Sequence, residues 1–390
     1  MKILILGGAS GDVGRALTRI LVNEKTRITH LTITSRSIDT ARKFVIELGD
    51  ERVTALGLDV TDKRQLMDAM QGHNLIVNIV GPFSDYGIPV MKAAIESKVN
   101  YIDICDDIEP TVEALQLDRF AKDSGVFLLL CMGWFPGMSN LRVKALADQM
   151  DEVEEIVTAW VAGKKSPEDI PSKGLAGIEH YIKALTGKIS TYREGHRIKI
   201  PAHQKGVTFQ FPDPLGEYSC YQIEHPETAT LPYVIPGVKT ASTLGALYPK
   251  KRNKTIRFFT RLIDVKLFSI HLFIRISGMS MRSKKKVGLP TLIASYMSCI
   301  GKKNGKKGQL SYCEVNTKLT IAEATSQPLA CAIFYIASGG RIEPGVNFPE
   351  TALKVEDILR IADGHNLSFV KDAMAKTTWS EEVISLEKTT

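Results

Sequence analysis

Residues 2–22 read KILIL, then GGASGDVG, then RALTRILV, and this stretch decides the fold of the chain. The first run is apolar and predicts a buried strand. The glycine-rich run predicts a tight turn, and the apolar positions that follow recur with the period of a helix. Glycines with the spacing G-x-x-G-x-x-G between a strand and a helix let a cofactor pyrophosphate approach the backbone, where the helix N-terminus favours its charge. We therefore expect a dinucleotide cofactor to meet the residues of this turn: Gly8, Ser10, Gly11, Asp12, Val13 and Gly14.

The end of the second predicted strand indicates which dinucleotide binds. Residues 29–34 form that strand, about 20 residues beyond the turn, and Ser35 and Arg36 follow it, with Arg42 in the next segment. A site for NAD would place an acid here to accept a hydrogen bond from the ribose 2′-hydroxyl group. A hydroxyl and a guanidinium instead suit a 2′-phosphate, which is anionic and only accepts hydrogen bonds. This pattern predicts NADP(H), and the alternative is that Arg36 is a solvated turn residue.

Strands and helices continue to alternate up to about residue 140. This alternation predicts a doubly wound parallel sheet, the Rossmann type of α/β fold. Cofactor contacts are also expected from Asp59 and Val60 after the third strand, and from Gly81 and Pro82 after the fourth. For Gly81 and Pro82 the alternative is a plain strand stop and helix start. The six predicted strands are residues 2–6, 29–34, 52–57, 75–80, 101–104 and 126–130.

The second half of the chain has a different pattern. Residues 155–161, 311–315 and 318–321 predict strands, and residues 190–233 mix β-branched and aromatic residues with Gly and Pro, which is typical of short antiparallel strands. Residues 174–185, 328–338 and 355–363 predict helices. We therefore expect an α/β protein with three parts, in which a second α+β domain is inserted before C-terminal helices that return to the first domain. The parts are residues 1–140, which bind NADP, residues 141–340, which bind substrate and dimerise, and residues 341–390.

Composition narrows the class of protein. The chain has 390 residues, 44% of them hydrophobic, and a net charge of +7, which is ordinary for a folded protein of two domains. Its six cysteines are far apart and no Cys/His cluster has metal-ligand spacing, so we expect reduced thiols and no metal. The chain opens directly on its first strand, so we expect no targeting segment and a cytoplasmic location.

Residues 250–307 hold most of the positive charge. They contain sixteen Lys or Arg and one acid, Asp264, a net charge of +15 that leaves −8 for the rest. Phe, Leu and Ile are frequent between residues 256 and 277, but charged residues interrupt them, which argues against a membrane span. Two interpretations remain: a helix that lies on an anionic membrane or a partner, or a helix buried at a domain or dimer interface. Nucleic acid is not expected, because apolar residues separate the basic ones.

Five residues are candidates for proton transfer. Asp106 follows the fifth strand at the carboxyl edge of the sheet and could move a proton or hold a substrate amine, as could Asp107; the alternative is an N-cap. His180 and Tyr181 follow a glycine turn, and His225 lies in Glu224-His225-Pro226-Glu227. Imidazole and phenol groups can donate protons during hydride transfer, although packing is the alternative for each.

Several segments together resemble the saccharopine dehydrogenase superfamily. The resemblance implies a Rossmann domain, an α+β domain that dimerises, NADP as cofactor and hydride transfer at a carbon that forms or breaks a C–N bond. The insert at 250–307 departs from compact relatives that act on amino acids, and this puts an amino-acid substrate in doubt. The segments are residues 8–14, 78–83, 87–90, 101–106, 133–140, 192–195, 211–216, 225–227 and 344–350.

Two functions from different classes follow from this pattern. The first is an NADP(H)-dependent oxidoreductase that transfers hydride to or from an imine, a secondary amine or a conjugated double bond of a small substrate. If the insert lines the substrate site, that substrate would be apolar. The second is a non-catalytic NADP-binding sensor or scaffold attached to a membrane or a protein partner. Polar residues gathered after the fourth, fifth and sixth strands favour the enzyme. A homodimer and, through residues 250–307, a location peripheral to an anionic membrane are expected alongside it.

Overall fold

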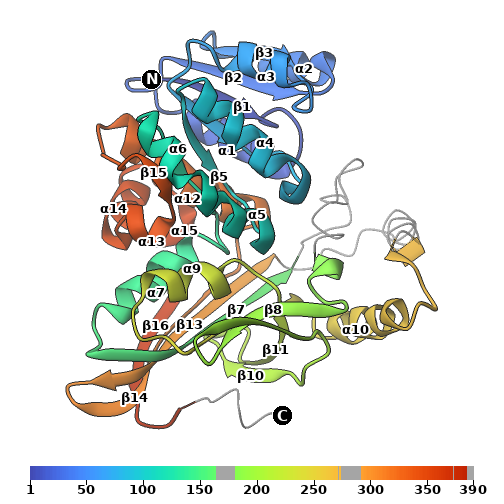
Figure 1. Ribbon diagram of the computed structural model, residues 1–390, viewed down its shortest axis with the longest axis vertical. Helices are drawn as coiled ribbons and strands as arrows, with labels where there is room; N and C mark the ends of the chain where they lie inside the picture. The colour runs from blue at the N-terminus through green and yellow to red at the C-terminus, as the bar shows by residue number, and fades with distance from the viewer. Residues whose placement is uncertain (164–180, 271, 274–290, 372, 384–390) are drawn as a thin grey trace. The chain divides into compact units, whose positions relative to one another are not determined.

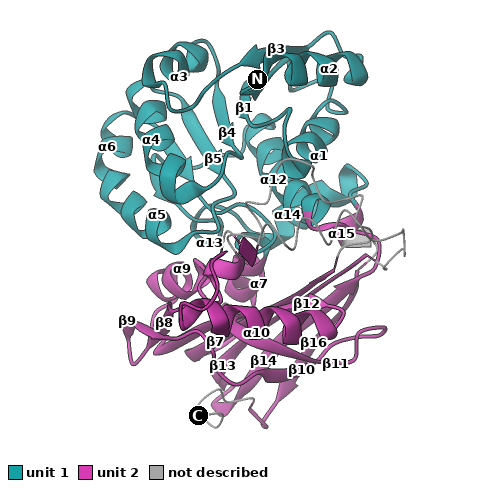
Figure 2. Ribbon diagram, turned by 90° about the vertical axis from the view of Figure 1, so that its right-hand side faces the viewer, with its two compact units in different colours: residues 1–138, 322–367 teal, residues 139–321, 368–390 magenta. Residues whose placement is uncertain are grey.

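The structure is a computed structural model that describes the chain except for residues 164–180, 271, 274–290, 372 and 384–390. It divides into two compact units (Figures 1 and 2). Unit 1 consists of Met1–Met138 and Ala322–Leu367, and unit 2 of Ser139–Ile321 and Ser368–Thr390. The chain therefore leaves the first unit once, returns to it, and ends in the second.

Unit 1 is built on a seven-stranded sheet whose neighbouring strands all pair in parallel, in the order β15-β6-β5-β4-β1-β2-β3. Four of the five residues of β1 are buried, because helices cover a parallel sheet on both faces. The predicted Rossmann-type α/β fold is confirmed, with β15 as a seventh strand. The strands are β1 (Lys2–Leu6), β2 (His30–Ser35), β3 (Val53–Gly57), β4 (Leu75–Asn78), β5 (Asn100–Asp103), β6 (Phe127–Leu129) and β15 (Gly345–Asn347).

Helices pack on this sheet through apolar side chains. Those of α3, α4, η1 and α6 form a core cluster with residues of β1, β4, β5 and β6. Helix α12 is buried along most of its length and belongs to unit 1. The chain therefore returns to unit 1 at about residue 322, whereas the sequence predicted the return at residue 341. The helices are α1 (Asp12–Leu21), α2 (Ile38–Leu48), α3 (Lys63–Met70), α4 (Phe83–Glu96), α5 (Ile108–Glu113), the 3-10 helix η1 (Ala114–Leu117), α6 (Asp118–Asp123), α12 (Ile321–Ala337), α13 (Pro349–Ala352) and α14 (Val355–Gly364).

Unit 2 is built on a mixed sheet in the order β10-β11-β12-β7-β13-β14-β16, with β8 and β9 attached beside β12. β12 and β7 pair in parallel, and the other neighbours are antiparallel. The strands are β7 (Glu152–Gly163), β8 (Lys188–Arg193), β9 (His196–Pro201), β10 (Val207–Gln210), β11 (Glu217–Ile223), β12 (Thr240–Tyr248), β13 (Leu292–Lys303), β14 (Lys306–Asn316) and β16 (Met374–Ser380). The helices are α7 (Met138–Ala147), α9 (Glu227–Val234), α10 (Lys251–Asp264) and α15 (Ser368–Lys371).

Two expectations for the second half were wrong. Residues 318–321 do not continue a strand, because the side-chain oxygen of Asn316 accepts the backbone N–H groups of Lys318 and Leu319, at 2.9 and 3.0 Å, and α12 starts at Ile321. The chain also does not end with helices on unit 1, because β16 pairs with β14 at the edge of the unit 2 sheet. Within the described part of the chain, no helix is long and apolar enough to cross a membrane.

Candidate functional site

The glycine turn between β1 and α1 has the geometry that a phosphate site needs. Gly11 is the N-cap of α1 with a φ of 79°, and no side chain caps this helix end. A Cβ atom on Gly11 would meet no atom within 4 Å, so the turn is open at this point. Ser10 and Asp12 are exposed beside it, Val13 is half-buried, and the backbone N–H groups at the start of α1 are available to an anion.

Gly8 and Gly14 allow α1 and the turn to pack closely against β1. A Cβ atom on Gly14 would lie 2.3 Å from the carbonyl oxygen of Gly7, and one on Gly8 would lie 2.9 Å from the side chain of Ile5. Only glycine lets the helix and the strand approach this closely. The residues present therefore fit the pyrophosphate of a dinucleotide.

The end of β2 fits the ribose of NADP. Ser35 is buried, and its hydroxyl accepts the N–H of Ser37. Arg36 follows at the surface, where its positive charge helps to lower the pKa of Asp59, although hydrogen bonds from Thr61 to that carboxylate are the larger cause. An exposed guanidinium at this point can pair with a 2′-phosphate. Asp59 and its neighbour Val60 follow β3, as expected.

The carboxyl end of β4 carries the next expected contacts. Gly81 and Pro82 are exposed, and Pro82 is the N-cap of α4. The backbone N–H of Ser84, in the first turn of α4, donates to the Asp107 carboxylate at 3.1 Å. Asp107 thus accepts from a donor of α4, whereas its side chain does not cap α5, the helix that follows it. Asp106, its half-buried neighbour, remains a predicted proton donor.

A buried chain of hydrogen bonds links β4 and β5 near this edge of the sheet, and it was not predicted from the sequence. Asn78 on β4 donates to the Tyr101 hydroxyl at 3.0 Å, and Tyr101 on β5 donates to Asp103 at 2.9 Å. The other carboxylate oxygen of Asp103 accepts the N–H groups of Cys105 and Cys131, at 3.0 and 2.8 Å. Burial raises the pKa of Asp103 to about 6 despite these donors. Tyrosine and aspartate two positions apart on one strand, and hence on one face, were the available signal.

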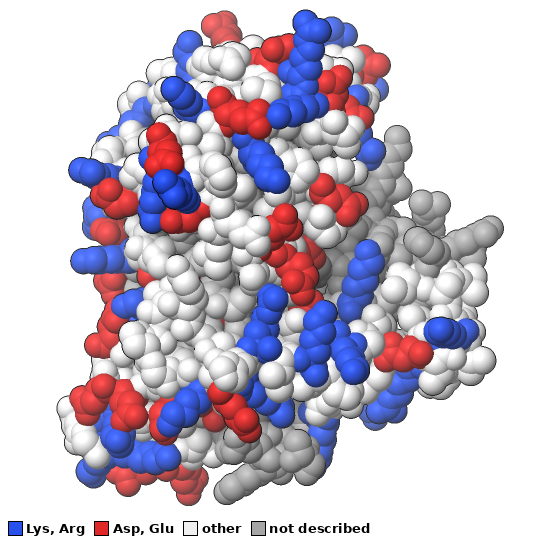
Figure 3. Space-filling view, viewed as in Figure 1, with Lys and Arg blue, Asp and Glu red and all other residues white. Residues whose placement is uncertain are grey.

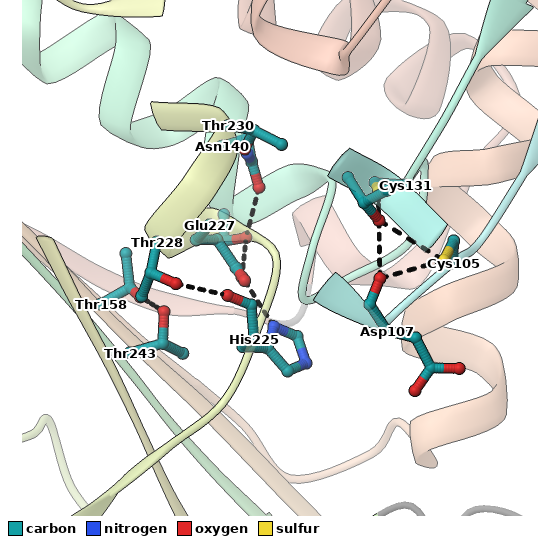
Figure 4. A network of polar contacts seen from close by, with 12 residues as sticks. Cys105, Asp107, Cys131, Asn140, Thr158, His225, Glu227, Thr228, Thr230 and Thr243 are labelled. Atoms are coloured by element: carbon teal, nitrogen blue, oxygen red, sulfur yellow. Dashed lines mark hydrogen bonds and ion pairs between the residues drawn. The ribbon is translucent and has the colours of Figure 1, made fainter. Parts of the chain in front are cut away.

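Two thiols lie next to this carboxylate. The hydroxyl of Thr111 is 3.5 Å from the sulfur of Cys105 and 3.5 Å from that of Cys131 (Figure 4 shows the two cysteines). Burial raises the pKa of both thiols, so they are protonated at neutral pH. Among the described residues, no group of three or more His, Cys, Asp and Glu could hold a metal ion.

In unit 2, His225 belongs to a buried polar network (Figure 4). Its Nδ1 contacts one carboxylate oxygen of Glu227, and the Ser139 hydroxyl donates to the other at 2.9 Å. Asn140 donates to the hydroxyl of Thr230 at 2.9 Å. His225 is 4% exposed and Glu227 is 1% exposed, so neither carboxylate nor imidazole is solvated. The contact with the carboxylate fixes the orientation of the ring. The sequence indicated His225, but not its pairing with Glu227.

The other two candidates lie elsewhere. Tyr181 is half-buried and its ring packs 5.5 Å from that of Trp160, in an apolar cluster that includes Leu185 and Ile223. Burial raises the pKa of the Tyr181 phenol. His180 lies outside the described residues, so Tyr181, His225 and Asp106 stay predictions, as does His180.

Comparison with known proteins shows which family the first part of the chain is similar to. Residues 3–129 match the model of the saccharopine dehydrogenase NADP binding domain. A "Lipid droplet localized protein" of Caenorhabditis elegans is 28% identical over 153 residues, which are 37% of this chain and 35% of the relative. The saccharopine dehydrogenase [NADP(+), L-glutamate-forming] of Pyricularia oryzae is 27% identical over 201 residues, 50% of this chain and 42% of that one. The matched segments thus span well under half the length of these relatives.

A solved structure shares the fold along nearly the whole chain. The apo saccharopine dehydrogenase (L-Glu forming) of Saccharomyces cerevisiae superposes with a TM-score of 0.67 at 15% identity, covering 97% of this chain and 99% of that one. The family match, the open glycine turn and Arg36 agree on the cofactor, which is NADP(H). Residues 3–129 of this chain match the NADP-binding domain of the saccharopine dehydrogenases, and the chain is similar to members of that family beyond this domain.

Proposed function

We propose that this protein is an NADP(H)-dependent oxidoreductase that transfers hydride to or from an imine, a secondary amine or a conjugated double bond of a small substrate. The observation that carries the proposal is the NADP cradle in a chain that also buries an oriented imidazole, that of His225. The cofactor supplies the hydride, and the protein has to supply or take up a proton. A pure nucleotide sensor would need no such group.

In this proposal, different residues of the protein bind the cofactor and move the proton. The glycine turn and Arg36 hold and orient the cofactor through its phosphates. His225 donates or accepts the proton, and its contact with Glu227 holds the ring in one orientation. Ser139 fixes the second oxygen of that carboxylate, so the pair cannot rotate apart. Asp106, beside the Asp103 network at the carboxyl edge of the sheet, is the second candidate for moving a proton.

The reaction class also draws support from the relatives. The name of the Pyricularia protein describes a dehydrogenase that uses NADP(+) and forms L-glutamate. The Caenorhabditis protein is named for its location on lipid droplets. Together with the apolar, basic segment after residue 250, that name supports an apolar substrate and a location beside a lipid surface. We infer a homodimer as well, in line with the family resemblance, and analytical ultracentrifugation tests it.

The test is turnover with a defined panel. Purified protein is incubated with NADPH and, in separate reactions, with cyclic imines, amine–oxoacid pairs and conjugated enones of short and long chain. We expect NADPH oxidation with at least one class. NADPH deuterated at the reactive carbon should then place deuterium in the product. NADPH binding without turnover on any class, in both directions, would instead support the sensor or scaffold.

A further inference from the structure

Helix α10 is attached to unit 2 by polar side chains. The side chain of Asn253 donates to the carbonyl of Leu247 at 2.8 Å and accepts its N–H at 2.7 Å. Arg257 donates to the carbonyl of Gln204 at 3.0 Å, and its guanidinium lies 4.1 Å above the ring of Tyr221. These contacts fix one side of the helix in the way that apolar packing usually does.

The last turn of α10 is fixed in the same way. One oxygen of Asp264 accepts the N–H of Gly187 at 2.8 Å, and the other lies 2.7 Å from His203 Nε2. The segment after the helix folds back on it through aromatic rings, since Phe259 lies 5.2–5.3 Å from Phe268 and Phe273. Both ends of α10 are therefore held in place by contacts that do not involve the exposed side chains of the helix.

The outward side carries large apolar residues. Phe258 is 59% exposed, Val265 is 62% exposed and Leu267 is 76% exposed. Ten large apolar side chains are exposed in the part of the chain that the structure describes, and four of them lie between residues 258 and 272. Single exposed apolar residues are normal on a surface, but a cluster of this kind marks an interaction site.

Basic residues surround these apolar ones. Lys251, Lys254, Arg261 and Lys266 are exposed, and the first three share a helix face with Phe258 because they recur every three to four positions. Residues 250–270 hold seven Lys or Arg and one acid, Asp264, whose carboxylate is already held by Gly187 and His203. Figure 3 shows Lys and Arg mixed with uncharged residues where Figure 1 draws α10. Exposed Phe and Leu flanked by cations are the two features that bind an anionic lipid surface.

We propose that α10 and the turn after it, residues 250–270, bind an anionic lipid surface, with Phe258, Val265 and Leu267 inserted among the acyl chains and the surrounding Lys and Arg side chains meeting the headgroups. The attachment needs neither cofactor nor substrate. Its failure would remove the proposed location beside a lipid surface but leave the proposed hydride transfer untouched, and a failed turnover assay would leave the attachment untouched.

The experiment is flotation of the full chain with vesicles of phosphatidylcholine, with and without phosphatidylserine, at low and high salt. We expect binding to the vesicles that contain phosphatidylserine and loss of most of it at high salt. The double variants Phe258→Ser/Leu267→Ser and Lys251→Glu/Arg261→Glu should each weaken binding by about tenfold or more. These residues are exposed, so the fold should survive, as NADPH binding by unit 1 and circular dichroism would report.

Two controls keep the result specific. Phe120→Ser removes a 62% exposed aromatic residue from α6, and Lys43→Glu/Lys92→Glu makes the same charge change on exposed positions of α2 and α4. Both should bind like the parent. Equal binding by the α10 variants and the controls would overturn the proposal. So would absence of binding to anionic vesicles at low salt, or a loss of self-association in the α10 variants without any vesicle binding, which would assign this surface to a second copy of the chain.

Discussion

A Cβ atom on Gly14 would lie 2.3 Å from the carbonyl oxygen of Gly7, whereas one on Gly11 would meet nothing within 4 Å. Two glycines of one motif therefore do different things. Gly14 lets α1 pack against the turn that follows β1. Gly11 keeps the approach to the helix N-terminus open, with a φ of 79° that L side chains rarely adopt.

Replacing Gly14 should damage the fold. We expect Gly14→Ala to lower the free energy of unfolding by about 2 kcal/mol or more, because the methyl group would overlap a backbone atom that has no room to move. Chemical denaturation with NADPH absent measures this. An unchanged denaturation midpoint would contradict the packing role of Gly14.

Replacing Gly11 should damage cofactor binding more than the fold. Gly11→Val places a branched side chain where the pyrophosphate must approach, so we expect NADPH binding to be lost. The positive φ costs about 1–2 kcal/mol of stability. The fold should survive this loss, and the far-ultraviolet circular dichroism spectrum should be unchanged. Calorimetric titration with NADPH is the measurement, and normal affinity in the variant would place the phosphates elsewhere.

Arg36 should account for the choice of NADPH over NADH. We expect the parent to bind NADPH at least about tenfold more tightly, which is ~1.4 kcal/mol. Arg36→Ala should remove most of this preference, because it should weaken the binding of NADPH but not that of NADH. Lys43→Ala, which removes an exposed charge from the same region, is the matched control and should leave the ratio unchanged. Equal affinities of the parent for the two cofactors would refute the role of Arg36.

His225 and Glu227 should act as a unit in turnover. With a substrate from the panel, we expect His225→Asn to lower kcat by about 10²–10⁴-fold, the usual worth of a proton donor. Glu227→Gln should lower kcat less and shift the acidic or basic limb of its pH profile, since the ring would lose its carboxylate partner. His203→Gln, at a histidine paired with Asp264 on unit 2, is the control. A pH profile that Glu227→Gln leaves unmoved would limit Glu227 to packing.

Asp103 should make the protein less stable as the pH rises. Its folded-state pKa of about 6 lies above the ordinary value of 3.8, so the folded state binds this proton more tightly than the unfolded state does. The stabilisation is complete below about pH 3.8 and is lost as the pH rises through 6, a change of about 3 kcal/mol. Asp103→Asn should therefore gain stability relative to the parent between pH 4 and pH 7, as paired denaturation curves would show. A constant difference over this range would contradict the raised pKa.

The Rossmann part of the fold could be predicted because its information is local. A run such as Lys2–Leu6, followed by the glycine turn and an amphipathic helix, determines strand, turn and helix within one segment. β15 and β16 could not be predicted in the same way. They are Gly345–Asn347 and Met374–Ser380, short or largely exposed, and each becomes a strand through pairing with a distant partner, β6 or β14.

The sequence by itself predicted the cofactor site, since the glycines, Ser35 and Arg36 would act through backbone geometry and charge that are fixed close to each residue. It also determined that residues 250–270 are basic and apolar. Only the tertiary structure decided which side chains meet. Glu227 pairs with His225 and Ser139, although 88 residues separate it from Ser139, and Asp103 accepts the N–H of Cys131, which lies just after β6. The structure alone also shows that α10 is held by Asn253, Arg257 and Asp264 while Phe258 stays exposed, because burial depends on what the rest of the chain places against a helix.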